Sequence, residues 1–142
     1  MAEQLIIPEK IKLFNIDIIE ASINDDVVED NLNFEFSVAH NTQHNLKDER
    51  VKIELYIKVL SKEGTGIKYH IDFHYHIEDL INHYKLNDKK QPIFSGQFIA
   101  TLLGISFSTA RGVIFQQLQK TSLKALVLPV VSPSKILASR NN

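Results

Sequence analysis

The chain has 142 residues, of which 44% are hydrophobic and 23% charged, and this composition is typical of one globular domain. The net charge of -1 gives no indication of a polyanionic or membrane partner, and the absence of cysteine excludes disulfides and thiolate zinc sites. No signal peptide is evident, and no uninterrupted apolar run reaches the roughly 18 residues needed to span a bilayer. We therefore predict a cytoplasmic protein with a single domain over residues 1–142, in which residues 1–9 form a flexible arm.

Alternating hydrophobic residues predict four strands before any helical pattern begins. We expect these strands over residues 11–22, 32–39, 51–59 and 67–77. The first changes phase after Leu13, which indicates a β-bulge. Residues 40–50 are polar and predict an exposed connection, whereas residues 61–66 contain two glycines and predict a tight turn that pairs the last two strands as a hairpin. This order predicts an α+β fold, with a four-stranded antiparallel sheet covered on one face by helices.

The second half of the chain predicts helices after a long crossover. The crossover, residues 78–96, is unusually long for a compact domain, and we expect it to have a function of its own. A short helix is predicted over residues 97–103, and Gly104 separates it from a main helix over residues 107–119 that Ser106 caps. An extended apolar segment over residues 126–131 and a last helical turn over residues 134–139 complete the prediction.

The main helix presents two different faces. Its apolar stripe consists of Phe107, Ala110, Ile114 and Leu118, and the opposite face consists of Thr109, Gly112, Gln116 and Gln119. The second face has no formal charge, whereas a solvated helix face normally carries Lys, Glu or Asp. It fits either a helix sandwiched inside one domain or a helix shared between subunits, where Gly112 permits close approach. Arg111 falls within the apolar stripe and is predicted to form a structural ion pair.

Three segments and the order of the elements resemble the SecB family of export chaperones and SecB-like proteins. The segments are KIKLFNIDIIEAS at the first strand, FIATLLGISFSTARGVIFQQL around the helices, and LVLPVVSPSKIL near the end. The resemblance covers residues 8–137 and implies a sheet backed by helices, assembled as a homotetramer that is a dimer of dimers. It also implies that helices contribute to the interface between dimers, that long hydrophobic grooves hold nonnative polypeptides, and that there is no catalytic residue or cofactor.

The chain departs from the export chaperones in two respects. Their exposed sheet face is acidic and docks the translocase motor, whereas the exposed face predicted here is mixed or basic, with Lys52, Lys58 and Lys68 among its residues. Those chaperones also continue into a longer helix and an acidic tail after the position of Leu137. Docking to a translocase motor is therefore in question, and a role as a chaperone of an antitoxin in a toxin-antitoxin pair is equally open.

A histidine-rich strand is the best candidate for metal or catalytic chemistry. His70, Asp72, His74 and His76 share one face of the fourth predicted strand, and imidazole with carboxylate suits a transition metal. These positions extend over roughly 20 Å at the rise of a strand, so only neighbours can share an ion. We therefore predict no metal site. The chain also lacks a nucleophile elbow, a phosphate loop and a basic-aromatic array, which argues against an enzyme and against nucleic-acid binding.

Apolar residues of the crossover and of the terminal extended segment form a candidate groove for nonnative polypeptide clients. We expect Tyr84, Phe94 and Phe98 to face Leu126 and Val127, although each also fits a small core under a long loop. The leading hypothesis is thus a non-enzymatic SecB-like chaperone, serving either protein export or an antitoxin. The alternative is an oligomeric interaction module that docks one fixed partner.

Overall fold

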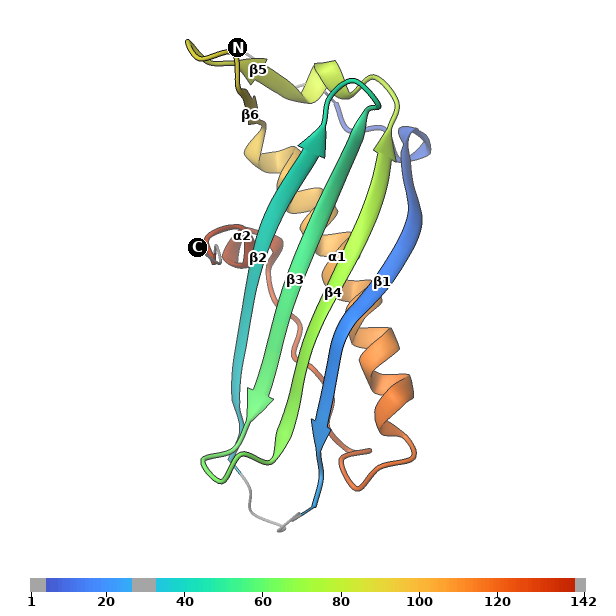
Figure 1. Ribbon diagram of the computed structural model, residues 1–142, viewed down its shortest axis with the longest axis vertical. Helices are drawn as coiled ribbons and strands as arrows, with labels where there is room; N and C mark the ends of the chain where they lie inside the picture. Colours follow the sequence, from blue (N-terminus) through green and yellow to red (C-terminus); the bar gives the residue numbers. More distant parts are fainter. Residues whose placement is uncertain (1–4, 27–32, 140–142) are drawn as a thin grey trace.

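The computed structural model describes residues 5–26 and 33–139, which form a twisted antiparallel sheet with one long helix on a single face (Figure 1). The sheet has the strand order β1-β4-β3-β2. Its strands are β1 (Ile11–Asn24), β2 (Glu35–Asn45), β3 (Arg50–Leu60) and β4 (Gly66–Ile77), and a 3-10 turn, η1 (Pro8–Lys10), precedes β1. The predicted α+β class and the helix-covered antiparallel sheet are confirmed. The start of the predicted second strand and residues 1–4 of the predicted arm lie outside the described residues.

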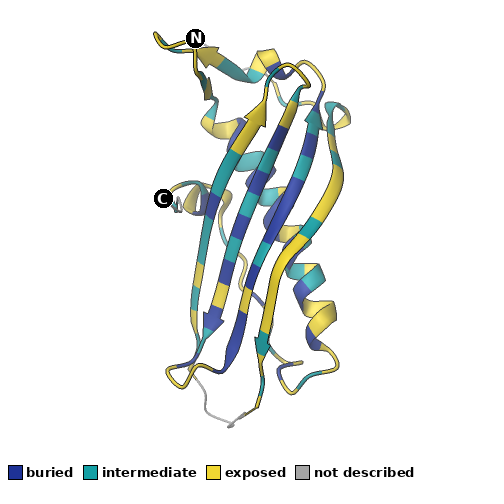
Figure 2. Ribbon diagram, in the orientation of Figure 1, coloured by how far each residue is buried: buried dark blue, intermediate teal, exposed yellow. Residues whose placement is uncertain are grey.

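The hairpin of β3 and β4 forms the centre of the sheet, as predicted. Every second residue of both strands is buried, and these residues form nearly half of the core (Figure 2). The turn ends at Gly66, whose φ of 143° and close approach to β3 exclude a side chain, since a Cβ there would lie 1.9 Å from the Val59 carbonyl oxygen. The pairing of Leu60 with Gly66 fixes which residues lie opposite one another along the hairpin.

Strand β1 contains two irregularities rather than one. Its register against β4 shifts between Leu13 and Asn15, where the sequence predicts a bulge, and again between Ile18 and Glu20. The first bulge places Phe14 beside His74, with ring centroids 6.0 Å apart, on the face of the sheet opposite the helix. β1 is an edge strand, and several of its apolar side chains remain exposed.

Strand β2 is longer than predicted. Residues 40–45, expected as an exposed connection, continue the strand, and only residues 46–49 form the turn to β3. His40 is buried, and its Nε2 donates a hydrogen bond to the Leu137 carbonyl oxygen at 3.0 Å. Its backbone N–H donates to the Ser139 carbonyl oxygen. The terminal segment thus covers polar residues of this edge strand that alternation alone does not identify.

A single helix, α1 (Gly96–Leu118), replaces the two helices expected from the sequence. Ser95, not Ser106, is its N-cap, and the Ser95 hydroxyl accepts a hydrogen bond from the Phe98 N–H. Gly104 lies inside the helix, where a Cβ would lie 3.1 Å from Pro133 Cγ, so this glycine permits close packing rather than ending the helix. The predicted apolar stripe of α1 is buried against the sheet.

The continuous helix also has the length and hydropathy of a membrane span, which corrects the expectation that no segment does. By composition, one charged residue, Arg111, lies within it. Its buried residues nevertheless belong to the same core as β3 and β4, and 44% of the apolar window is buried. These properties are also those of a core helix that covers a sheet.

The crossover contains structure of its own. A 3-10 turn, η2 (Leu80–His83), precedes a small hairpin of β5 (Tyr84–Leu86) and β6 (Pro92–Phe94) next to the start of α1 (Figure 1). After α1, the chain returns along the helix as an extended segment and ends in α2 (Pro133–Leu137), in agreement with the prediction. Helix α2 packs against both α1 and β2.

Candidate functional site

An aromatic cluster joins the crossover hairpin to the start of α1. Tyr84 and Phe94 are paired across the hairpin, with ring centroids 5.7 Å apart, and Phe94 lies 6.0 Å from Phe98. His83 stacks almost parallel on Phe98 at 4.4 Å, and His44 of β2 meets the Phe94 ring at 5.6 Å. The structure therefore brings together three residues of the predicted groove. Phe98 is fully buried and anchors the cluster, whereas Tyr84 and Phe94 are half-buried.

The outer surface of the crossover carries apolar side chains that the sequence analysis does not include in the groove. Ile81, Leu86 and Ile93 are 70%, 55% and 61% exposed. Leu86 shares a face of the hairpin with Tyr84, because residues two apart in a strand point to the same side. The alternation in residues 84–86 and 92–94 is the signal that could have identified these side chains, but the strands are too short for it to be conspicuous.

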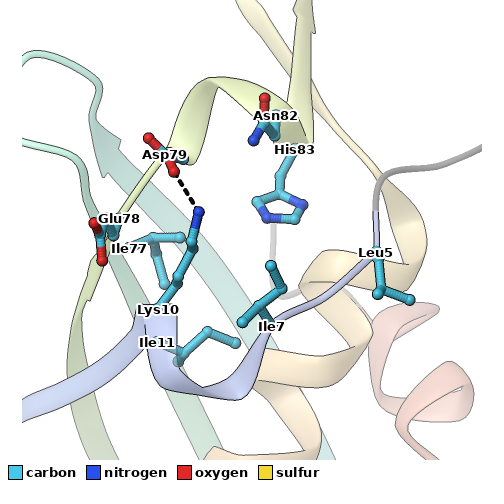
Figure 3. Close-up of a pocket in the computed structure, with 9 residues that line it drawn as sticks. All are labelled: Leu5, Ile7, Lys10, Ile11, Ile77, Glu78, Asp79, Asn82 and His83. Atoms are coloured by element: carbon cyan, nitrogen blue, oxygen red, sulfur yellow. Dashed lines mark hydrogen bonds and ion pairs between the residues drawn. The ribbon is translucent and has the colours of Figure 1, made fainter.

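A small cavity lies between η1 and η2, beside the aromatic cluster (Figure 3). Its volume is about 90 Å³, far below the several hundred that a drug-sized ligand requires. Lys10 and Asp79 form an ion pair across it, and this contact raises the pKa of Lys10. Partial burial, and secondarily the nearby Lys10 charge, lower the pKa of His83, whose ring points toward Ile7. The ion pair between Lys10 and Asp79 therefore connects the start of β1 to the crossover.

Leu126 and Val127 lie elsewhere, and the predicted opposition to the aromatic cluster is wrong. They belong to the segment that returns beside the C-terminal half of α1, where Arg111 Nε donates a hydrogen bond to the Leu128 carbonyl oxygen at 3.2 Å. About 13 residues of helix separate Phe98 from Arg111, which corresponds to roughly 20 Å. In the described part of the chain, Arg111 has this carbonyl and no carboxylate within ion-pair distance.

The uncharged face of α1 lies at the surface of the described structure. Gly112, Gln116 and Gln119 are exposed and Thr109 is half-buried, so the four residues predicted to form an oligomer interface do lie together. Two large apolar side chains of the same helix, Ile105 and Phe115, are 36% and 44% exposed. A Cβ at Gly112 would have no neighbour within 4 Å, so this position is sterically open in the single chain.

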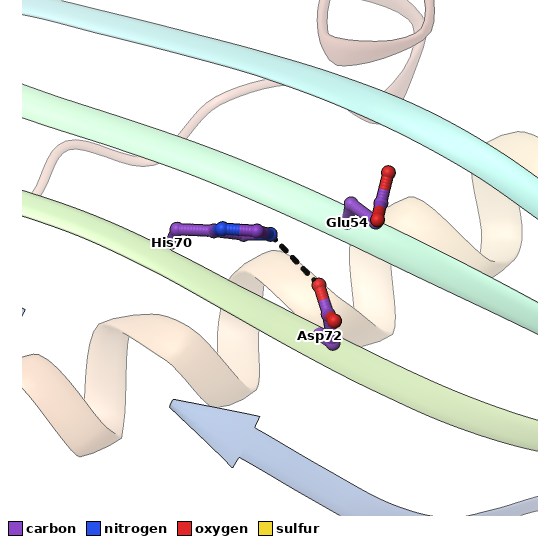
Figure 4. Close-up of side chains that lie close together, drawn as sticks. All are labelled: Glu54, His70 and Asp72. Carbon is purple, nitrogen blue, oxygen red and sulfur yellow. Dashed lines mark hydrogen bonds and ion pairs between the residues drawn. The ribbon is translucent and has the colours of Figure 1, made fainter. Parts of the chain in front are cut away.

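A group of polar side chains occupies the middle of the uncovered sheet face. Ligand atoms of Glu54, His70 and Asp72 lie within 4.8 Å of one another, and His70 Nε2 is 2.9 Å from Asp72 Oδ1 (Figure 4). Lys52 Nζ lies 3.3 Å from Glu54 Oε2 and 3.9 Å from Asp72 Oδ2. The ammonium group thus supplies positive charge to both carboxylates, and the arrangement has the character of an ion-pair network.

Histidines grouped by sequence are separated in this network. His74 pairs with Asp17 of β1 at 3.0 Å, away from His70, and His76 lies one row further along the sheet. Glu54 was absent from the sequence-based set, although the hairpin register places it opposite Asp72. Counting outward from the turn that precedes Gly66 would have revealed this pairing.

This α+β fold, an antiparallel sheet with one long helix on a single face, is also found in a SecB-like chaperone. The solved structure is Mycobacterium tuberculosis Rv1957, a SecB-like chaperone in complex with a ChAD peptide from the Rv1956 HigA1 antitoxin. The likeness has a TM-score of 0.60 at 7% identity and covers 87% of this chain and 91% of that one. No family model matches the sequence. No curated protein matches it either. The comparison therefore shows the SecB-like fold.

Proposed function

We propose that this protein is a non-enzymatic chaperone of the SecB type that holds nonnative polypeptides on an apolar surface. The fold shared with a chaperone in complex with an antitoxin peptide is the observation that carries this proposal. Such a chaperone could serve either protein export or the protection of an antitoxin. A cytoplasmic location and a homotetramer built as a dimer of dimers are part of the proposal.

The crossover hairpin is the proposed client-binding surface. One face of the hairpin offers exposed Leu86 beside the half-buried rings of Tyr84 and Phe94, and the other face offers exposed Ile93. Burying apolar side chains of a client gains about 25 cal/mol per Å² without requiring a particular sequence. Leu126 and Val127 provide a second, separate apolar segment. A long extended client that passes around α1 could contact both this segment and the hairpin.

The client surface can be tested without disturbing the core. Ile81, Leu86 and Ile93 are replaced together by serine, and the suppression of aggregation of reduced insulin and heat-denatured citrate synthase is measured by light scattering. We expect the triple variant to lose most of the suppression. Val127→Ser combined with Val130→Ser, at exposed positions on the return segment, tests the second segment separately, and a loss confined to the triple variant assigns client binding to the hairpin.

The same assay separates the proposal from its alternative. A holdase retards aggregation of both unrelated clients, whereas a module that docks one fixed partner protects neither. Unchanged suppression in the triple variant, as well as in a folded Tyr84→Ser/Phe94→Ser variant, would eliminate the hairpin as the client surface.

The uncharged face of α1 is the proposed interface between copies. Gly112 is sterically open, and glycine is unfavourable within a helix, so Gly112→Glu should leave the single chain at least as stable. Two buried carboxylates at an interface would repel each other and divide the assembly. Light scattering should therefore report a tetramer of the 16.2 kDa chain for the wild type and smaller species for Gly112→Glu.

Lys62→Gln is the control for this experiment, because it changes the net charge equally at the exposed β3–β4 turn. It should remain a tetramer. A wild-type protein that stays monomeric at all concentrations would contradict the assembly proposal and weaken the chaperone proposal with it.

A further inference from the structure

The uncovered face of the sheet is organised in rows of charge that run across the strands. Residues directly opposite one another share a face, so the printed register places side chains from all four strands in line. One end row consists of Lys12, His76, Arg50 and Asn45, and the next of Asn15, His74, Lys52 and Gln43. The third row consists of Asp17, Asp72, Glu54 and Asn41. Positive charge therefore gathers at the end of the sheet near the β2–β3 turn, and negative charge lies directly beside it.

The charged side chains of the inner rows are paired with one another. Lys52 lies between Glu54 and Asp72, and His74 pairs with Asp17. Within residues 5–26 and 33–139, by contrast, no carboxylate lies within 4.0 Å of the side-chain nitrogens of Lys12 or Arg50. The cations of the end row are thus available to a partner.

Arg50 is held in place by an aromatic ring rather than by a carboxylate. Its guanidinium carbon lies 5.1 Å from the centroid of the Phe14 ring, which the first bulge of β1 places on this face. Stacking on a ring orients the guanidinium and leaves its edge free for hydrogen bonds. Phe14 and Arg50 also line a shallow basin, together with Gln43, Asn45, Lys52 and His74.

We propose that this end of the sheet binds an acidic segment of a partner polypeptide, with side-chain carboxylates on Arg50 and Lys12. A guanidinium matches a carboxylate in a bidentate pair, and the Gln43 amide can complete the hydrogen bonding. The Asn45 amide is already hydrogen-bonded to Asp48. This surface is distinct from the proposed client surface, so the inference does not depend on the chaperone proposal.

The neighbouring acidic row favours a short acidic peptide over a nucleic acid. It lies only about 7 Å along the strands from the row of Lys52, and a continuous polyphosphate that extended over it would meet three carboxylates. A short acidic peptide can instead lie across the strands along the end row, clear of these carboxylates. The face thus discriminates between partners by repulsion as well as by attraction.

Fluorescence anisotropy of labelled hexaglutamate added to the full-length chain at ~50 mM salt tests the proposal, since low salt strengthens exposed ion pairs. We expect hexaglutamate to bind and hexaglutamine not to bind. Arg50→Gln should weaken hexaglutamate binding about tenfold, and Lys12→Gln severalfold, because hydrogen bonds to charged groups are stronger than neutral ones.

Lys58 and Lys68 supply the matched control. They lie opposite each other on the same face, about 26 Å along β3 from Arg50. Lys58→Gln/Lys68→Gln should bind hexaglutamate as the wild type does, and circular dichroism should report the same fold for every variant.

Three results would overturn the proposal: no binding of hexaglutamate, equal weakening by the control variant, or tighter binding of labelled hexathymidylate than of hexaglutamate. The last result would identify the surface as a site for nucleic acid instead.

Discussion

Tyr75 Oη and Ser106 Oγ lie 2.7 Å apart in the interior between the sheet and α1. The Tyr75 hydroxyl also donates a hydrogen bond to the Leu102 carbonyl oxygen at 3.3 Å, so Ser106 donates to Tyr75 when both bonds are formed. Ser106, which the sequence predicts as a helix cap, lies instead in the middle of α1 and is buried against the sheet.

Burial raises the pKa of Tyr75 to about 12 from its ordinary value of 10.0. The unfolded chain therefore loses this proton before the folded chain does, and stability that is present below pH 10 is lost progressively as the pH rises toward 12. The expected loss is roughly 3 kcal/mol, from two pKa units at 1.36 kcal/mol each. Denaturant unfolding at several alkaline pH values checks it.

Tyr75→Phe should abolish most of this alkaline loss while costing about 1 kcal/mol at neutral pH, because it removes the hydrogen bonds of the hydroxyl. If the pH dependence of Tyr75→Phe matches that of the wild type, the alkaline loss has another source. Tyr69, whose pKa burial also raises, is the group to examine next.

Gly104→Leu should detach α2 from α1. Even a Cβ at this position would lie 3.1 Å from Pro133 Cγ, and a longer side chain would occupy the position of the proline. We expect a destabilisation of about 2 kcal/mol, typical of overpacking, with faster amide exchange in residues 134–139. Ser108→Leu, one turn further along α1 at an exposed position, should leave the exchange of these residues unchanged.

The crossover should become less stable in mild acid because of His83. Its pKa is lowered, chiefly by burial, so the unfolded chain binds a proton first as the pH falls through the ordinary value of 6.5. Stability is therefore present above that pH and declines below it. The urea concentration at the unfolding midpoint should decrease as the pH is lowered from about 7.5 to about 5.5. His83→Phe should reduce this decrease while preserving the stacking on Phe98.

His76→Gln, on the uncovered face of the sheet, is the comparison for His83→Phe. It should retain the acid-dependent decline. An identical decline in the two variants would mean that another group is responsible.

Lys52→Met should destabilise the sheet by about 1 kcal/mol, because Glu54 and Asp72 would then lie together without the ammonium group that neutralises them. Lys58→Met provides the contrast on the same face of β3. Lys58 lies opposite Lys68, a like-charge pair, so its removal should be neutral or slightly stabilising. Chemical denaturation at neutral pH measures both, and equal effects would contradict the role given to Lys52.

The accuracy of the sequence-based prediction follows the range of the interactions involved. The alternation in residues 51–59 and 67–77 is local and strong, and both the hairpin and its buried face are confirmed. Residues 40–45 lack this alternation and were not predicted as a strand. An edge strand can contain polar side chains that a distant segment covers, as the terminal residues do at His40. Gly104 was predicted to end a helix for a similar reason. The residue whose close packing requires a glycine there, Pro133, lies far along the chain.

The candidate site shows the same division. Tyr84, Phe94 and Phe98 are close in sequence, and the structure brings them together as expected, although the hairpin that pairs Tyr84 with Phe94 was not predicted. The position of Leu126 depends on the length of α1, which was underestimated when the helix was divided. The rows of charge across the sheet depend on the register of all four strands and could not be read from any one of them.

The two register shifts of β1 determine what its outer edge can accept. A long regular row of unpaired backbone groups invites any extended chain to add as a further strand, whereas a bulge interrupts the row and increases the local twist. Here the undisturbed stretch between the shifts runs only from Asn15 to Ile18. A strand that continued past it would need irregularities at matching positions. The apolar edge is thereby protected from indiscriminate β-aggregation, which is a valuable property in a molecule whose proposed task is to meet unfolded chains.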